Sequence, residues 1–343
     1  MKPEQLVELV ESEYQYVQQE HGRWSLLSGP QDMELVAHAL RVVLHMGDAG
    51  ASLPEYLAVV RAQHADGGWG RESAEAESAA WVSAFLGLML IRGNVTLRNP
   101  QVEGAVWQTI RYFLDTQHSD GRWVDSEWGD LDTTSHPVSF FNVVLALGTP
   151  QMREAVRAAW GRGLQFILDG QSEDGGWYDP VFHPSGVETT AHLGQDAVVA
   201  SLVLPEGLPV QSACETALRW ILTHQAADGS WDDHNVDHTM DCTRSALLIS
   251  RLLKADERCQ ATLERAIRWI VAHKNPHGWP DFPGEQTNLE RTCDGLDVLC
   301  KYHAWRQSDP LEVVRRWGYT PGETMFPRPT ASPRGSELGS NAV

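Results

Sequence analysis

The chain alternates two kinds of apolar pattern. In the first kind, apolar residues recur every three or four positions between polar ones, as in VWQTIRYFLDTQ (106–117), ALRWILTHQ (217–225) and AIRWIVAHK (266–274). This spacing places the apolar side chains on one face of a helix. The second kind is more evenly apolar, as in AESAAWVSAFLGLMLI (76–91) and TSHPVSFFNVVLALG (134–148). The pattern therefore predicts pairs of helices, one half-buried and one more deeply buried.

A Gly-containing turn that ends in Trp separates the two helices of each pair. Six such turns recur at intervals of about 45 to 54 residues, and they end at Trp24, Trp69, Trp123, Trp177, Trp231 and Trp279. Helix pairs at a fixed period stack into a solenoid or close into a ring. We predict an all-α fold, an (α/α)6 barrel of six helix-pair repeats, with the more apolar helices inside and the turn tryptophans joining neighbouring pairs.

The domain organisation follows from the extent of the repeats. They predict a single barrel domain over residues 1–320, a length sufficient for a large core. The segment 321–343 is rich in Pro, Ser and Gly. That composition is typical of a disordered tail.

Charge and cysteine content narrow the functional classes. The formal net charge is −19, which disfavours nucleic acids and anionic membrane surfaces as partners. The acidic N-terminus lacks the apolar region of a signal peptide, and no apolar run approaches the roughly 18 residues of a membrane span. The five cysteines show no paired spacing, so we expect a cytoplasmic protein without a disulfide framework.

The candidate chemistry lies in DLDTT, residues 130–134, where an inner helix is expected to begin. An acid at a helix start can bind free N–H groups. Each repeat carries an acid roughly 8 to 11 residues after its Trp, namely Glu34, Glu77, Asp132, Glu188, Asp241 and Glu290. Asp132 can therefore be one helix cap among six. Alternatively, Asp130 and Asp132 form a carboxylate pair that cannot easily ionise twice, so that one keeps a proton for acid catalysis.

The Gln…Gly-x-Trp units resemble the repeats of terpene cyclases and of protein prenyltransferases, and the resemblance covers nearly all of the predicted barrel. DLDTT resembles the Asp-x-Asp-Asp-Thr acid motif of class II terpene cyclases, including the squalene-hopene type. Thr133 stands in the fourth position, as in the Asp-x-Asp-Thr-Thr variant of bacterial cyclases that form drimane-type skeletons. The resemblance implies protonation-initiated cyclisation of a linear isoprenoid, such as farnesyl or geranylgeranyl diphosphate, to a decalin-type product that retains the diphosphate.

The resemblance also implies roles for individual residues. Asp132 would be the general acid, Asp130 would hold it in a reactive rotamer, and Thr133 and Thr134 would complete the motif. His136 lies one helical turn beyond Asp132 and can bond either carboxyl group. Asn142 can either orient Asp132 or lie satisfied in the core.

Binding residues can be proposed for both ends of such a substrate. Aromatic faces stabilise carbocations, and the candidates near the predicted mouth are Trp128, Phe140, Phe141, Tyr178 and Phe182, with at most one of the two adjacent phenylalanines facing the cavity. A diphosphate would need cations, for which the candidates are Arg71, Arg122, Arg244 and Arg291. Each of these arginines can instead be a surface salt-bridge residue. We expect no required cofactor, with Mg²⁺ possible for diphosphate binding.

The sequence departs from the family in size, and it leaves two rival functions open. Class II cyclases commonly carry a second helical domain, and drimane-type relatives can carry a phosphatase, so a partner subunit or separate phosphatase is possible. One rival is a zinc prenyltransferase-like enzyme, for which the candidate ligands are Asp237, His238, Asp241, Cys242, Cys293 and Asp294. The other is a non-catalytic lipid-binding or scaffold barrel. An apolar cavity with a single acid would favour the cyclase, and a cavity filled by large side chains would favour the scaffold.

Overall fold

The computed structural model describes residues 1–125, 128–179, 185–198, 200 and 210–307. Within these ranges the chain is helical, and no β-strand is formed apart from two isolated bridges. The predicted all-α class is therefore confirmed. The predicted domain end at residue 320 and the tail 321–343 lie outside the described residues.

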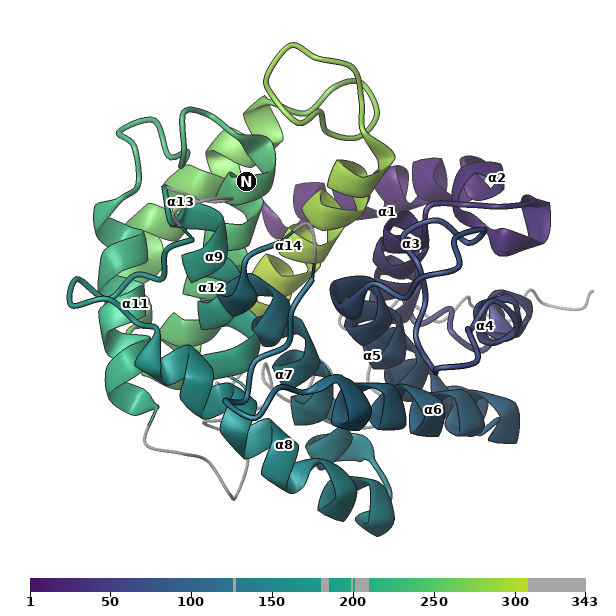
Figure 1. The fold of residues 1–343 in the computed structure, drawn as a ribbon. Helices are drawn as coiled ribbons and strands as arrows, with labels where there is room; N and C mark the ends of the chain where they lie inside the picture. Colours follow the sequence, from purple (N-terminus) through teal and green to yellow (C-terminus); the bar gives the residue numbers. More distant parts are fainter. Residues whose placement is uncertain (126–127, 180–184, 199, 201–209, 308–343) are drawn as a thin grey trace, which may run out of the picture.

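The more apolar helices form a closed inner ring (Figure 1). Each packs against the next in sequence, and the last packs against the first, which closes the ring. Its members are α3 (Met33–His45), α5 (Ala80–Leu97), α7 (Asp130–Leu147), α9 (Val187–His192) with its π-helical continuation η2 (Leu193–Val198), α12 (Val236–Leu252) and α14 (Leu289–Gln307).

The amphipathic helices lie outside this ring, as their pattern predicts. In α6, the residues Val102, Val106, Ile110 and Phe113 are buried at three- and four-residue spacing. The opposite face is polar, so each outer helix covers the ring with one apolar stripe. The outer helices are α1 (Pro3–Gln19), α4 (Leu53–Arg61), α6 (Pro100–Thr116), α8 (Pro150–Asp169), α11 (Gln211–Thr223) and α13 (Asp256–Ala272), and the short α2 (His21–Trp24) and η1 (Leu26–Ser28) lead into α3.

The turn tryptophan connects the outer and inner helix of each pair. Trp123 Nε1 donates to the Phe113 carbonyl of α6 at 2.9 Å, and its backbone N–H donates to the Thr134 hydroxyl of α7 at 3.0 Å. The indole bond recurs at Trp24, Trp69, Trp177, Trp231 and Trp279. The backbone bond recurs to Ser83, Thr190, Thr239 and Thr292. These paired bonds set the register of each inner helix against its turn.

The glutamine before four of the turns joins one unit to the next. Gln117 Nε2 donates to Gly121 O and to Ala159 O, the latter on α8, at 2.9 Å each. Gln63, Gln171 and Gln225 bond in the same way. Gly121 adopts φ +99°, and a Cβ there would lie 2.4 Å from Arg162 O. Glycine is required at this turn because both the conformation and the close approach exclude a side chain.

Helix α5 is the most apolar of the inner helices. Among the described helices it is the one whose length and composition would suit a membrane span, and 61% of its 18-residue window is buried within the protein. One such helix is weak support for a membrane span, because core helices of soluble proteins have the same composition. Its apolar surface is used in the ring, where it forms one side of the cavity described next.

Candidate functional site

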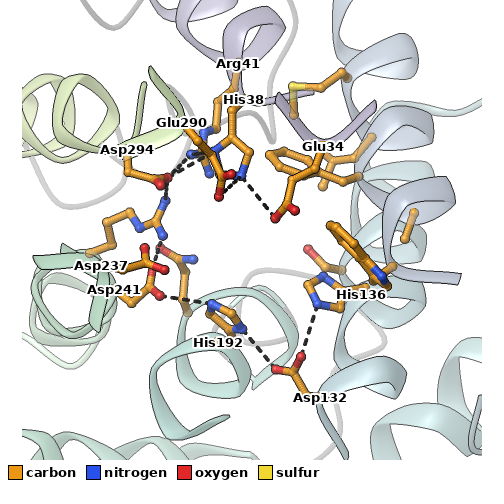
Figure 2. A pocket seen from close by; sticks show the side chains of 18 of the residues that line it. Glu34, His38, Arg41, Asp132, His136, His192, Asp237, Asp241, Glu290 and Asp294 are labelled. Carbon is orange, nitrogen blue, oxygen red and sulfur yellow. Dashed lines mark hydrogen bonds and ion pairs between the residues drawn. The ribbon is translucent and has the colours of Figure 1, made fainter. Parts of the chain in front are cut away.

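The inner ring encloses a cavity of about 240 Å³, lined by side chains from all of its helices (Figure 2). The bonds between Trp and Ser or Thr align these helices with one another. In α7, Asp132 stands two residues before the anchoring Thr134. Two residues before the Ser or Thr that binds the turn in the other inner helices are Trp81, Glu188, Asp237 and Glu290. One helical turn after these positions are Phe85, His192, Asp241 and Asp294, which also line the cavity.

This alignment changes which residues of the other repeats are equivalent to Asp132. Asp237, not Asp241, matches Asp132, because Thr239 is the hydroxyl that binds Trp231. In α5 the matching position is Trp81, whereas Glu77 is exposed ahead of the helix. The inner face of the ring is therefore polar at most units and aromatic at α5.

The cavity wall has an apolar sector and a charged sector. The apolar sector is formed mainly by α5 and consists of Trp81, Ala84, Phe85, Leu88 and Met89, extended by Trp128 and Val143. In the charged sector, acids outnumber Lys and Arg side chains. The acids are Glu34, Asp132, Glu188, Asp237, Asp241, Glu290 and Asp294, and the cations are Arg41, Arg92, Arg244, Arg291 and Lys301. The cavity is thus open rather than filled, and it carries many charges rather than a single acid.

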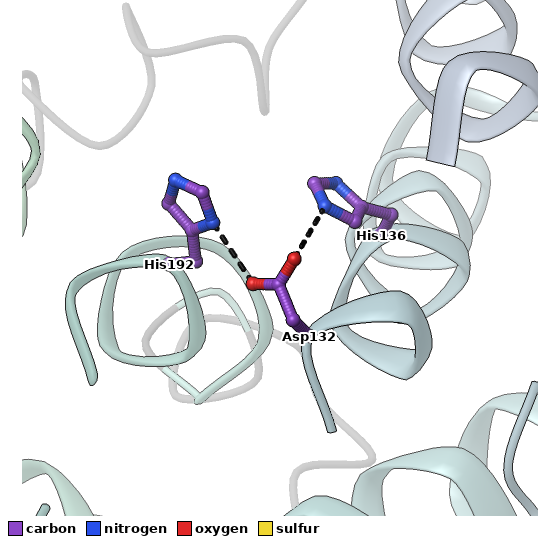
Figure 3. A group of neighbouring side chains, drawn as sticks. All are labelled: Asp132, His136 and His192. Carbon is purple, nitrogen blue, oxygen red and sulfur yellow. Dashed lines mark hydrogen bonds and ion pairs between the residues drawn. The ribbon is translucent and has the colours of Figure 1, made fainter. Parts of the chain in front are cut away.

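Asp132 lies at the border of the two sectors, held by two histidines (Figure 3). Its Oδ1 is 2.9 Å from His192 Nδ1, and its Oδ2 is 3.5 Å from His136 Nε2. The Asp132 side chain is 2% exposed. His136 is one turn along α7, whereas His192 is the last residue of α9, directly before the π-helical turn η2. Such π-helical turns are frequent at functional sites.

The two histidines control the protonation of Asp132. Burial by itself raises the pKa of the carboxyl group, but the charges and hydrogen bonds of His192 and His136 hold that pKa well below its usual range. Burial likewise opposes charge on His192, and the Asp132 carboxylate overcomes it, raising the pKa of His192 to about 9. At neutral pH the group is therefore a carboxylate bound to protonated imidazole.

Asp130 does not form the expected carboxylate pair with Asp132. Its Oδ2 accepts from Arg122 Nη1 at 3.0 Å, and its side chain is 42% exposed. Asp130 therefore pairs with an arginine of the preceding turn instead of with Asp132. The groups that lower the pKa of Asp132 are His192 and His136.

A chain of charged groups leads from Asp132 across the ring. His192 Nε2 lies 3.1 Å from Asp241 Oδ2, and Asp241 pairs with Arg244. Arg244 Nη1 then donates to Asp294 and to Asp297 at 3.2 and 3.1 Å. The chain therefore connects α7, α9, α12 and α14.

The remaining motif residues are not among those that line the cavity. Thr134 accepts from Trp123 N, and the buried Thr133 hydroxyl has no hydrogen-bond partner among the described residues. Asn142 Oδ1 accepts from Trp160 Nε1 at 2.7 Å, which places Asn142 in the core between α7 and α8. Of the two alternatives for Asn142, the core position is the one observed.

Of the predicted aromatic residues, Trp128 lines the cavity. Its ring meets the ring of Trp81 edge-on, with centroids 6.1 Å apart. Both Phe140 and Phe141 are fully buried against Phe113, so neither faces the cavity. Tyr178 lies outside the ring, where its hydroxyl accepts from Trp220 Nε1. Phe182 falls outside the described residues.

The predicted arginines divide into two groups. Arg71 Cζ lies over the ring of Trp81, 5.8 Å from its centroid, and Arg122 pairs with Asp120 and Asp130. Neither arginine is among the residues that line the cavity. Arg244 and Arg291 do line it, but each is surrounded by carboxylates. The partners of Arg244 are Asp241, Asp294 and Asp297, and those of Arg291 are Asp237, Asp281, Glu290 and Asp294. A diphosphate would have to compete with these acids.

The zinc prenyltransferase ligand set is not assembled in the described part of the chain. Cys242 and Cys293 are fully buried outside the cavity lining, and burial raises the pKa of both thiols. His238 bonds to Asp232 and Glu188 instead. The groups of described residues spaced for a metal ion contain no cysteine.

Several site residues were missed at the sequence level. His192 follows Glu188 by four residues, just as His136 follows Asp132, and aligning the repeats on their threonines would have identified it. The same four-residue spacing relates Glu34 to His38 and Glu290 to Asp294. The contacts between these residues arise only when the ring closes.

Comparison with known proteins supports a relationship to terpene cyclases. No family model matches the chain. Residues of the chain are 22% identical over 144 residues to lanosterol synthase erg7A of Aspergillus fumigatus, covering 41% of this chain and 18% of that protein. The structure resembles ent-copalyl diphosphate synthase from Streptomyces platensis, with a TM-score of 0.53 and 16% identity over 78% of this chain and 48% of the other.

Other enzymes share the same architecture. A glycosyl hydrolase family 88 protein from Bacteroides vulgatus matches with a TM-score of 0.63 and 13% identity, over 89% of this chain and 99% of the other. The structural similarities therefore show the helical-barrel fold, and a fold does not determine chemistry. The sequence match to lanosterol synthase supports a relationship of this chain to the terpene cyclase superfamily, whose members are enzymes. The chain spans about a fifth of the length of the lanosterol synthase and about half of the copalyl diphosphate synthase.

Proposed function

We propose that this protein cyclises a linear isoprenoid by protonating its terminal alkene, with Asp132 as the general acid. The observation that carries the proposal is the position of Asp132: buried, held by one histidine on each carboxylate oxygen, and lining the same cavity as Trp81 and Trp128. The resemblance of DLDTT to the class II acid motif and the match to lanosterol synthase support the same reaction.

The two histidines make protonated Asp132 a strong acid. When its O–H bond breaks and a C–H bond forms at the alkene, the product is the carboxylate that His136 and His192 stabilise. Proton transfer is therefore more favourable than from an ordinary carboxyl group. The positive charge moves to the neighbouring tertiary carbon, where the next alkene of the chain attacks it and closes a ring. Loss of a proton from the cyclic cation ends the reaction.

The apolar sector is suited to the hydrocarbon chain. Trp81, Phe85 and Trp128 offer aromatic faces to a cation, and Leu88 and Met89 exclude water from it. The cavity, about 240 Å³, lies below the usual range of about 300 to 1,000 Å³ for ligand pockets, which favours a fifteen-carbon chain over a twenty-carbon one. A decalin-type product of the drimane class is the expected outcome.

The charges of the charged sector determine which head group of the substrate can bind there. Because Arg244 and Arg291 are neutralised by aspartates, we favour a neutral head group over a diphosphate. If a diphosphate is used, Mg²⁺ would be needed to offset the carboxylates around it.

The experiment compares three proteins on a small set of substrates. Wild type, Asp132→Asn and Glu77→Gln are incubated with farnesol, farnesyl diphosphate and geranylgeranyl diphosphate, with and without Mg²⁺. Products are dephosphorylated where necessary and analysed by GC-MS. Glu77 is an exposed acid from the preceding repeat and serves as the matched control.

We expect a cyclic alcohol from wild type and Glu77→Gln, and none from Asp132→Asn. Product from all three proteins would move the acid to another residue. Absence of product from all three would favour a non-catalytic barrel or a requirement for a partner subunit.

A further inference from the structure

A second group of side chains gathers in the cavity away from Asp132. Glu34 and His38 come from α3, and Glu290 comes from the start of α14 (Figure 2). His38 Nε2 lies 3.7 Å from Glu34 Oε1 and 3.7 Å from Glu290 Oε1. The three ligand atoms lie within 4.8 Å of one another. None of these residues has a role in the cyclisation proposed above.

The orientation of His38 is fixed from its other side. Its Nδ1 lies 3.1 Å from Asp294 Oδ1, and the Asp294 side chain is fully buried. Arg41 Nη2 lies 2.9 Å from the same nitrogen. Nε2 points the opposite way, toward the carboxylates of Glu34 and Glu290. A metal ion would bind at these three atoms by displacing the proton that Nε2 carries in the metal-free protein.

The distances from His38 Nε2 to the two glutamates are longer than hydrogen bonds and short enough for a shared metal ion. A proton on Nε2 would have to bridge 3.7 Å to either oxygen, which is longer than a hydrogen bond. For two separations of 3.7 Å and a third of at most 4.8 Å, the point equidistant from the three atoms lies about 2.4 Å or less from each of them. Zinc–nitrogen and zinc–oxygen bonds are about 2.0 to 2.2 Å long, so small adjustments of the glutamates suffice.

We propose that Glu34, His38 and Glu290 bind a divalent transition-metal ion, with Zn²⁺ as the ion of reference. The aspartate–histidine–metal arrangement through Asp294 is the common outer shell of such sites. One imidazole and two carboxylates suit Zn²⁺ better than Mg²⁺, which prefers oxygen ligands only. Three protein ligands leave positions open to the cavity, where water or an oxygen atom of a substrate head group would bind.

Two arginines lie next to the proposed metal site, and their positive charges oppose binding of the ion. Arg291 Nη2 also contacts Glu290 Oε1, and Arg41 Nη2 lies 2.5 Å from Asp294 Oδ1. Each arginine is itself paired with further carboxylates of α12 or α14. Binding of the ion therefore requires Glu290 to share its carboxylate between Arg291 and the metal. The proposal does not depend on the cyclisation reaction.

Zinc binding is measured directly, by isothermal titration of chelator-treated protein with ZnCl₂ and by metal analysis after dialysis. We expect about one zinc per chain in wild type. Separate Glu34→Gln, His38→Gln and Glu290→Gln variants should each weaken binding at least tenfold. Millimolar Mg²⁺ should not displace the ion.

The matched controls are Asp132→Asn and His192→Gln, which disrupt the other metal-spaced group in the same cavity, Asp132, His136 and His192. These variants should bind zinc as wild type does. The proposal is overturned by three results: no zinc bound by wild type, zinc binding unchanged in all three ligand variants, or loss of zinc in the Asp132 and His192 controls. Circular dichroism melts establish that each variant is folded, and Glu34→Gln, the most exposed of the three ligands, decides the matter if the others unfold.

Discussion

His192 Nδ1 lies 2.9 Å from Asp132 Oδ1, although 60 residues separate them in the chain. The contact joins α9 to the neighbouring inner helix α7. It turns a carboxylate at the start of a helix into one member of a buried ion pair. The behaviour of Asp132 therefore depends on a residue from the following helix pair.

The ion pair predicts a change in the protonation of His192 when Asp132 loses its charge. In wild type the pKa of His192 is raised to about 9, because the Asp132 carboxylate outweighs the effect of burial. In Asp132→Asn, burial remains and the charge of Asp132 is removed, while Asp241, 3.1 Å from Nε2, and Glu188 still favour the protonated ring. We expect the pKa of His192 to fall below its wild-type value, as measured by NMR titration of the labelled imidazole. The resonance of the exposed His118 serves as an internal control. An unchanged titration of His192 would show that Asp132 is not its partner in solution.

The rate of cyclisation should rise as the pH falls. His136 and His192 hold the pKa of Asp132 below its usual range, so only a small fraction of the protein carries the catalytic proton at neutral pH. That fraction increases about tenfold for each unit of decrease in pH until Asp132 titrates. We expect product formation under substrate saturation to increase from pH 8 to pH 5.5. A rate that is flat or increases with pH would rule out protonated Asp132 as the acid.

The free energy of unfolding should decrease at both high and low pH. The pKa values of His38 and His192 are raised to about 9 in the folded protein, and an unfolded histidine titrates near 6.5. Their contribution is therefore fully present below about pH 6.5 and is lost as the pH rises through 9. Asp132 has a lowered pKa, so its contribution is lost as the pH falls below about 4.

We expect the free energy of unfolding to fall by about 1 to 3 kcal/mol per histidine between pH 6 and pH 9.5. Urea denaturation at the two pH values measures this change. The variant His192→Gln should show a smaller fall than wild type. Equal falls in the two proteins would mean that His192 is not protonated in the folded state.

The adjacent threonines of the motif should differ in their effect on stability. Thr134 Oγ1 accepts the backbone N–H of Trp123, whereas the Thr133 hydroxyl is buried without a partner among the described residues. Thr134→Val leaves the N–H of Trp123 unsatisfied and should cost about 1 to 3 kcal/mol. Thr133→Val removes an unpaired hydroxyl and should be neutral or stabilising. Thermal or urea denaturation of the two variants provides the comparison, and an equal loss from both would contradict the assigned bond.

The fold was largely accessible from the sequence because each repeat carries its own local signals. The apolar spacing of α6, the Gly121 turn and Trp123 each act within one unit, so they are legible without the structure. The acid Asp132 was identified for the same reason. Its partner His192 was not identified, because it lies 60 residues further along the chain. The carboxylate expected to act on Asp132, that of Asp130, pairs with Arg122 instead.

The cavity residues were harder to predict because they depend on neighbouring units. A helix of apolar pattern such as α7 does not reveal that Phe140 and Phe141 face α6 while Ser139 and Val143 face the cavity. Arg244 and Arg291, two of the arginines expected to hold a diphosphate, pair with aspartates of other helices as well as with acids of their own. The pairings between helices follow from ring closure, and no spacing within one repeat encodes them.

The contact of α14 with α3 also has a consequence for the order in which the protein is made. Arg41 is synthesised 253 residues before Asp294, and Arg244 is synthesised 50 residues before it. A buried cation without its partner costs several kcal/mol, so we expect the ring to close only after α14 has been synthesised. A chain that ended before α14 would leave Arg41 without Asp294 and one side of the cavity without its wall.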